Sequence, residues 1–156
     1  MVYEKYANMA QLPDTWNLLH GDHGGHPMLV RLNTGAAALA HRGTHDIRIG
    51  VAVPFNEPDP DGLPEMVEGD VLTVFEDLLI DMAGNRGTLV AVITAAGMRE
   101  FVLYASDEQW IDDFQRALKS AMPSHQVQVV AERDPEWDLY RSFQPWPTRP
   151  ANPWPG

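Results

Sequence analysis

The stretch Thr88-Leu-Val-Ala-Val-Ile-Thr-Ala-Ala-Gly-Met-Arg-Glu-Phe-Val-Leu-Tyr-Ala-Ser106 decides the fold. It predicts a β-hairpin, because two runs rich in β-branched and aromatic residues flank a turn from Ala95 to Met98 that contains a glycine. Both runs are apolar at nearly every position, a pattern typical of strands that are covered on both faces of a sheet. We therefore expect this hairpin to lie inside a sheet, with other parts of the chain or a partner against each face.

Amphipathic patterns on either side of the hairpin predict one helix before it and one after it. Apolar residues recur at helical spacing from Val71 to Met82, where Asp70 and Gly84 are placed to cap the two ends. After the hairpin, a capping box that begins at Ser106 precedes a second apolar stripe from Trp110 to Met122. Both stripes are expected to cover the same face of the hairpin.

Two further strands complete this unit. His45 to Pro54 alternates apolar and polar residues, which predicts a strand with one apolar face. His125 to Arg133 alternates more weakly, which favours a strand at a sheet edge. The order strand, helix, strand, strand, helix, strand predicts an α+β fold of the ferredoxin-like βαββαβ type, an antiparallel sheet with both helices on one face.

The two ends of the chain add a hairpin and a short helix. Thr15 to His20 and Pro27 to Asn33 predict an N-terminal β-hairpin, and Asp134 to Phe143 predicts a helix with Asp134 as its N-cap and a proline at its first position. Thr34 to Gly43 fits either a helical turn or a loop. The N-terminal hairpin, the C-terminal segment or a second copy of the chain is expected to cover the other face of the central hairpin. The sequence thus divides into an N-terminal extension (1–14), a single α+β domain (15–143) and a tail rich in proline and tryptophan (144–156).

Composition narrows the classes of partner. The formal net charge is −11, from 22 acidic and 11 basic residues, so direct binding to nucleic acid or to an anionic membrane is not expected, whereas a basic protein fits well. There is no cysteine, which excludes disulfides and thiol chemistry and is compatible with a reducing cytoplasm. No run approaches the roughly 20 apolar residues of a membrane span, so we expect a cytoplasmic protein.

Four segments together carry a family resemblance: Asp61-Gly-Leu-Pro64, Leu72-Thr-Val-Phe-Glu-Asp-Leu-Leu79, Ile93-Thr-Ala-Ala-Gly-Met-Arg-Glu-Phe-Val-Leu-Tyr104 and Asp134-Pro-Glu-Trp-Asp-Leu-Tyr140. With Trp16, they resemble the bacterial family catalogued as domain of unknown function 695, over about Trp16 to Pro145. The resemblance implies a ferredoxin-like fold and a distant similarity to the regulator B proteins that bind and restrain ribonuclease E. It favours protein binding and implies no catalytic residue.

The N-terminal histidines are candidate metal ligands. His20, Asp22, His23 and His26 could offer three imidazoles and a carboxylate to zinc or another transition metal, which would activate a water molecule. The alternative is a solvated, glycine-rich turn, because the spacing matches no established metal motif.

The acidic loop from Glu57 to Glu68 partly fits a calcium loop. It places side-chain oxygens at positions 1, 3, 5 and 12 and a glycine at position 6 of that pattern. Its prolines restrict the wrap, and a strand precedes it where a calcium loop has a helix. The alternative is an acidic turn that binds no ion.

Four residues are candidate binding residues. Arg99 and Glu100 follow the central turn on opposite faces of one strand, so one of them could project into a cleft; the alternative is a surface charge with an ion-paired neighbour. Trp137 and Tyr140 belong to the Asp-Pro-Glu-Trp segment. No catalytic motif occurs, and we predict no catalytic residue and no cofactor.

Together these observations favour a non-enzymatic module that binds another protein. Its acidity and the apolar second face of its hairpin suit a regulator, or an immunity-like inhibitor of a basic toxin or nuclease. The rival hypothesis is a metal-dependent hydrolase built on the N-terminal histidines. A third hypothesis is a homodimer that pairs its open sheet faces.

Overall fold

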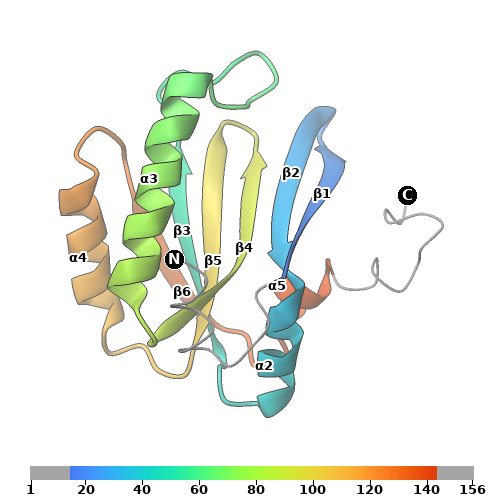
Figure 1. The fold of residues 1–156 in the computed structure, drawn as a ribbon, viewed down its shortest axis with the longest axis vertical. Coiled ribbons are helices and arrows are strands. Elements are labelled where there is room, and N and C mark those ends of the chain that lie inside the picture. The colour runs from blue at the N-terminus through green and yellow to red at the C-terminus, as the bar shows by residue number, and fades with distance from the viewer. Residues whose placement is uncertain (1–14, 144–156) are drawn as a thin grey trace.

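The computed structural model describes residues 15–143, which fold as one six-stranded antiparallel sheet with helices on both faces (Figure 1). The strands lie in the order β1-β2-β4-β5-β3-β6. The predicted α+β class is therefore confirmed. The strands are β1 (Trp16–His23), β2 (His26–Asn33), β3 (Ile47–Pro54), β4 (Gly87–Ala95), β5 (Met98–Ala105) and β6 (Gln128–Arg133). The helices are the 3-10 turn η1 (Thr34–Ala36), α2 (Ala37–Arg42), α3 (Met66–Ala83), α4 (Ile111–Ala121) and α5 (Asp138–Arg141).

The hairpin β4–β5 occupies the interior of the sheet, as predicted. β2 pairs with the outer side of β4 and β3 pairs with the outer side of β5, so both hairpin strands are bonded on each side. Its turn residues Ala96 and Gly97 have φ angles of 53° and 81°, the left-handed backbone that a two-residue hairpin turn requires. β3 alternates buried and half-buried residues, and β6 is an edge strand, so both of these predictions are also confirmed.

Helices α3 and α4 cover one face of the sheet (Figure 1). Phe75 and Leu79 of α3, and Phe114 and Leu118 of α4, are buried in the same apolar cluster as Val51 of β3. Each fully buried side chain of this kind contributes about 2 kcal/mol through the apolar area removed from water. This layer is the larger of the two apolar clusters, and both predicted helical stripes contribute to it.

The start of α3 differs from the prediction. The helix begins at Met66 after Glu65, so Asp70 lies one turn inside it and does not cap it. Met66 and Val67 in the first turn are exposed to solvent. The spacing of apolar residues in the sequence therefore does not show where the helix begins. The other end is as predicted, because Gly84 ends the helix and its N–H donates to the carbonyl of Ile80 at 3.0 Å.

The capping box predicted at Ser106 does not form. α4 begins at Ile111, and the residue at its N-cap, Trp110, makes no side-chain cap. The indole N–H of Trp110 instead donates to the carbonyl of Asp107 at 3.0 Å, within the turn that leads from β5 into the helix. This turn connects the end of β5 to α4, so the helix begins after the residues of the predicted capping box.

The N-terminal hairpin lengthens the sheet and does not cover it. β2 pairs with β4, with Leu29 opposite Thr94 and Leu32 opposite Ala91, so the predicted role of this hairpin as a cover for the second face is wrong. The segment Thr34 to Gly43, which fitted a helical turn or a loop, forms η1 and α2. β4 is thus hydrogen-bonded along both edges, to β2 on one side and to β5 on the other.

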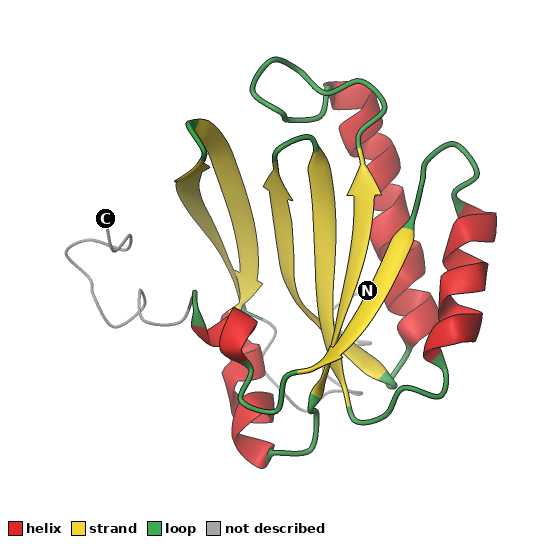
Figure 2. Ribbon diagram, turned by 180° about the vertical axis from the view of Figure 1, so that it is seen from behind, coloured by secondary structure: helices red, strands yellow, loops and turns green. Residues whose placement is uncertain are grey.

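The second face of the sheet is covered by α2 and α5, which lie together on the side opposite α3 and α4 (Figure 2). Leu39 of α2 and Tyr140 of α5 are buried against Val30, Leu32 and Val102 of the strands. The chain therefore closes part of this face with its own C-terminal segment, one of the three predicted covers.

Within residues 15–143, no helix has the length and apolar character needed to cross a membrane. The predicted N-terminal extension (1–14) and the tail rich in proline and tryptophan (144–156) lie outside the described residues.

Candidate functional site

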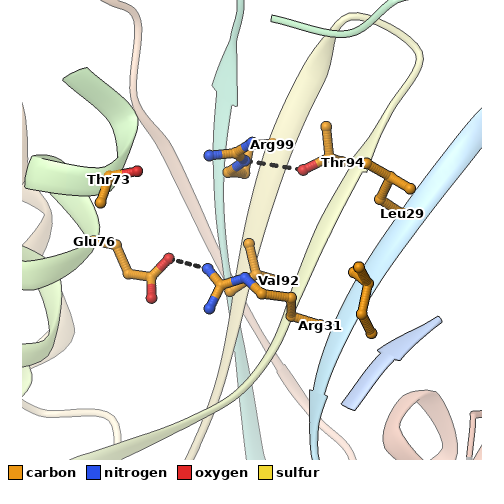
Figure 3. A pocket seen from close by; sticks show the side chains of 8 residues that line it. Leu29, Arg31, Thr73, Glu76, Val92, Thr94 and Arg99 are labelled. Atoms are coloured by element: carbon orange, nitrogen blue, oxygen red, sulfur yellow. Dashed lines mark hydrogen bonds and ion pairs between the residues drawn. The ribbon is translucent and has the colours of Figure 1, made fainter. Parts of the chain in front are cut away.

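A pocket of about 370 Å³ lies beside α3, on the same face of the sheet as that helix (Figure 3). It arises because the N-terminal hairpin extends the sheet past α3, leaving a hollow between the helix and strands β1, β2, β4 and β5. We call it the arginine pocket. Its lining residues are Leu18, Leu29, Arg31, Thr73, Glu76, Val92, Thr94 and Arg99.

Arg31 and Glu76 form an ion pair across the arginine pocket (Figure 3). Arg31 comes from β2 and Glu76 from α3, so the pair joins the N-terminal hairpin to the helix. The Arg31 guanidinium also lies over the ring of Trp16, 5.6 Å from its centroid, a distance at which a cation attracts an aromatic face. The charge of Arg31 is thus already matched within the chain.

Arg99 lies differently in the same pocket. Its Nε donates to the hydroxyl of Thr94 on β4 at 2.9 Å, and no carboxylate of the described residues forms an ion pair with its guanidinium. Burial lowers the pKa of Arg99, as does the nearby charge of Arg31, while Glu76 opposes that change. The side chain stays charged because the ordinary pKa of arginine is so high. Of the four candidate binding residues, Arg99 is the one that lines the arginine pocket.

Glu100 occupies the opposite face of β5, as the alternation of a strand requires. Its carboxylate lies against Gly50 of β3, where an added Cβ would come within 2.5 Å of Oε2. Burial raises the pKa of Glu100, and the charge of Arg48 offsets part of that rise. Glu100 therefore has no share in the arginine pocket, and the two neighbouring candidates act on different faces.

Trp137 and Tyr140 are each 1% exposed, which places them inside the molecule. The ring of Trp137 stacks on Tyr104 with 3.9 Å between centroids, and its indole N–H donates to the carbonyl of His45 at 2.6 Å. The Tyr140 hydroxyl donates to the carbonyl of Asn33 at 2.7 Å, and burial raises the pKa of that hydroxyl to about 12. These contacts give both residues a structural role in fixing α5 to the sheet, and neither presents a surface to a partner.

Asp134, the first residue of the Asp-Pro-Glu-Trp segment, ties this segment to the sheet by hydrogen bonds. Its buried carboxylate accepts from the Tyr104 hydroxyl at 2.7 Å, from Arg48 at 3.3 Å and from the backbone N–H of Asp138 at 2.8 Å. It thus binds backbone N–H groups at the start of α5, but the predicted N-cap is wrong: the helix starts at Asp138, its N-cap residue is Trp137, and the proline is not at the first helical position. Trp137 lies between Asp134 and α5 and has a φ of 57°. Its stacking on Tyr104 and its hydrogen bond to His45 hold it in this left-handed conformation.

The outer surface of α3 carries an exposed row of apolar side chains. Val67, Val71, Val74 and Leu78 are 77%, 38%, 61% and 36% exposed, and they recur at intervals of four, three and four residues. We call this row the α3 stripe. The sequence pattern assigned Val71 and Leu78 to the core, which is wrong: the core is reached by the neighbouring positions Leu72, Phe75 and Leu79, and the helix has a second apolar row beside them.

The four predicted metal ligands do not converge. Along β1 the side chains alternate, so His20 and Asp22 face one side of the hairpin while His23 faces the other, directly opposite His26. The Asp22 carboxylate accepts from the N–H of Gly25 at 3.1 Å and so serves the turn. In the part of the chain that the structure describes, no three His, Asp or Glu side chains are placed to share one metal ion. The arrangement of these side chains therefore gives no support to the predicted metal site.

The structure does not support the calcium loop either, because Glu68, the last of its expected ligands, binds groups of the protein instead. The Glu68 carboxylate accepts from the backbone N–H groups of Asn56 and Glu57 at 2.6 and 3.2 Å, and from His125 at 2.6 Å. Burial alone would raise the pKa of Glu68, but these hydrogen bonds outweigh it and the pKa is lowered. Asp59 likewise binds the backbone N–H groups of Asp61 and Leu63, both at 2.9 Å. These carboxylates hold the loop itself.

Sequence reasoning missed Arg31, Glu76 and Thr94. Arg31 did carry a signal, a charge inside the apolar run of β2. Glu76 and Thr94 carried none, since their convergence with Arg31 depends on the pairing of β2 with β4, a contact between segments about 60 positions apart that no local pattern encodes.

Comparison with known protein families finds one match. Residues 14–144 match the family described as "Family of unknown function (DUF695)". Searches among curated proteins and among solved structures found no similar protein. The match covers all of the residues that the structure describes, including the central hairpin, the arginine pocket and the α3 stripe.

Proposed function

We propose that the chain, which belongs to the DUF695 family, is a non-enzymatic protein-binding module that binds a basic amphipathic helix of its partner on the α3 stripe. The observation that carries this proposal is the exposure of four large apolar side chains in one row on α3. Scattered apolar residues are normal on a protein surface, but a contiguous row that continues for three turns marks an interaction site.

The spacing of the stripe suits a helix as its occupant. Intervals of four, three and four residues from Val67 to Leu78 are those of the apolar seam through which two helices pack side by side. A helix that lays its own apolar face along such a row is a recurring mode of protein recognition. An extended peptide would instead need an open sheet edge, which α3 does not offer.

Charge sets the kind of helix. α3 contains five acidic residues and no basic one, and the exposed Asp70 and Asp77 each precede a residue of the stripe. Two copies paired through this stripe would bring these carboxylates together, which disfavours the homodimer. A partner helix with lysine or arginine beside its apolar seam would meet opposite charge, and the net charge of −11 would attract it from a distance.

The topology supports a finer assignment of the fold. Strands β4, β5, β3 and β6 stand in the order expected of a ferredoxin-like βαββαβ unit, with α3 and α4 as its two helices and the N-terminal hairpin added beside β4. A role as a regulator or an immunity-like inhibitor is suggested by the acidity of the chain, and the absence of cysteine suits the cytoplasm. Each of these is part of the same proposal.

A designed peptide tests the proposal. The probe is a synthetic peptide of heptad repeats with leucine at the positions that face α3 and lysine at the positions beside them. Its control is a scrambled peptide of equal composition whose leucines do not recur at helical spacing. We expect calorimetry to show that the wild type binds the amphipathic peptide at least tenfold more tightly than the scrambled one. The scrambled peptide measures the unspecific attraction between lysine and an acidic protein.

Surface variants locate the binding. The double variant Val67→Ser and Val74→Ser removes apolar area from the stripe without changing the charge, so it should bind both peptides equally. Val130→Ser is the matched control, because Val130 is 49% exposed but lies on β6. Equal binding of both peptides by the wild type, or an unchanged preference in the double variant, would show that the stripe is not the binding site.

A further inference from the structure

The arginine pocket holds hydrogen-bond donors for which residues 15–143 supply no acceptor. Arg31 and Glu76 satisfy one another, whereas the Nη groups of Arg99 form no hydrogen bond with any described residue. The Thr94 hydroxyl accepts from Arg99 Nε at 2.9 Å, and its own proton has no acceptor among residues 15–143. The guanidinium lies in the space between α3 and the strands (Figure 3). Both free donors border the same hollow.

Burial makes these donors significant. Thr94 is only 4% exposed, and Arg99 is half-buried, so water reaches them poorly. A buried donor without an acceptor costs free energy, and a buried guanidinium without an anion costs more. An anion that enters the pocket would recover that cost, since arginine presents its two Nη groups as a fork that matches the two oxygens of a carboxylate.

The charge of the pocket selects the class of anion. Its two arginines and one glutamate leave a net charge of +1, which a monoanion neutralises. A phosphate dianion would bring a second negative charge next to Glu76, whose carboxylate stays paired with Arg31. Leu18, Leu29 and Val92 supply an apolar part of the lining, beside the hydroxyl-bearing Thr73 and Thr94. A carboxylate joined to a short apolar chain fits both parts of the lining.

We propose that the arginine pocket is a binding site for a small monocarboxylate, whose oxygens accept from the Nη groups of Arg99 and the Thr94 hydroxyl while its apolar portion lies against Leu29 and Val92. The volume of about 370 Å³ is in the range of small-molecule pockets. This site is separate from the α3 stripe, and either can fail without the other.

Hexanoate is the probe that tests this site, and hexanol and hexyl phosphate are its comparisons. Titration followed by two-dimensional NMR of the full chain should show hexanoate shifting Arg99 and Thr94 with millimolar affinity, hexanol at least tenfold weaker, and hexyl phosphate no tighter than hexanoate. Tighter binding of hexyl phosphate would overturn the assignment of a carboxylate, and no binding of hexanoate would overturn the site.

Adjacent residues supply the control. Arg99→Gln removes the fork and should weaken hexanoate at least tenfold, and Thr94→Val, which keeps the shape of the side chain, should weaken it several-fold. Glu100→Gln changes a charge at the next residue but on the opposite face of the sheet, and it should leave the affinity unchanged within twofold. The Thr94→Val result stands if Arg99→Gln fails to fold. Equal affinity in wild type and Thr94→Val, or a loss in Glu100→Gln as large as in Arg99→Gln, would contradict the proposal.

Discussion

At Asp134 a single carboxylate joins three parts of the chain. It receives the Tyr104 hydroxyl from the central hairpin, Arg48 from β3 and two backbone N–H groups from the start of α5. Burial would raise the pKa of Asp134, but these donors together outweigh burial and lower it. The residue thus works as a structural anchor, and its negative charge is what the donors require.

Replacing that charge should destabilise the protein in a pH-dependent way. We expect Asp134→Asn to lower the free energy of unfolding by about 2 kcal/mol at neutral pH, because hydrogen bonds to a charged acceptor are lost or weakened. A lowered folded pKa gives stability that is present above the ordinary value of 3.8 and is lost as the pH falls through the folded pKa. The difference between wild type and variant should therefore shrink in acid. Urea unfolding at several pH values measures it.

Tyr104→Phe is the matched control for that variant. It removes one donor but keeps the carboxylate and the ring that stacks on Trp137, so it should cost about 1 kcal/mol. Its loss should also shrink in acid, but less than that of Asp134→Asn, because the remaining donors still lower the pKa of Asp134. A loss in Asp134→Asn that is no larger than in Tyr104→Phe, or that stays constant into acid, would show that the charge of Asp134 carries no special weight.

At the residue scale, the sequence predicted which face of its own strand or which end of a helix a residue occupies better than whether the residue is buried. It predicted that a helix follows Asp134 and that Arg99 and Glu100 lie on opposite faces of one strand, since both follow from local geometry, but it placed the N-cap at Asp134 where the structure has Trp137. It did not show that Trp137 is buried, because an aromatic residue in a short segment suits a core and an interface equally well. Only the packing of α5 on the sheet decides between them.

Elements are joined through close backbone contacts as well as side chains. Between β3 and α3 the loop turns at Gly62, whose φ is 83° and whose carbonyl accepts from the N–H of Gly97 at 3.0 Å. A Cβ at Gly62 would lie 3.0 Å from that nitrogen. The loop thus sits against the turn of the central hairpin, where only glycine fits.

Gly62→Ala should therefore lower the free energy of unfolding by about 2 kcal/mol, from the left-handed backbone and the crowded nitrogen. Gly69→Ala is the opposite case. Gly69 lies within α3, an added Cβ there meets nothing, and alanine in a helix interior should raise stability by about 1 kcal/mol. Thermal unfolding of the two variants should give shifts of opposite sign, and a shared sign would contradict this account of the loop.

At the element scale, the helices and strands that could be predicted were those with a clear period of apolar residues. The strict alternation of β3 and the apolar runs of the central hairpin placed those strands, because burial on one or both faces leaves a periodic trace. The start of α3 left no trace, since its first turn is exposed. The position of the N-terminal hairpin beside β4 depends on pairing between distant segments, and local sequence carries no signal for it.

At the scale of the whole molecule, the chain has a net charge of −11, and the part that the structure describes exposes the apolar α3 stripe. Because Asp70 and Asp77 adjoin that row, we expect the protein to remain a monomer. Light scattering at low and moderate salt should give the mass of one chain, 17.4 kDa. A dimer that strengthens at high salt, where the carboxylates are screened, would show that the stripe serves self-association.

The location of partner binding is the central claim, and NMR mapping tests it most directly. With the leucine and lysine peptide added to the wild type, the account predicts that backbone shifts concentrate on α3 between Met66 and Leu78 and weaken as salt is raised. Shifts that concentrate instead on the second face of the sheet, around Glu100 and Val130, or that spread evenly over the acidic surface, would contradict it.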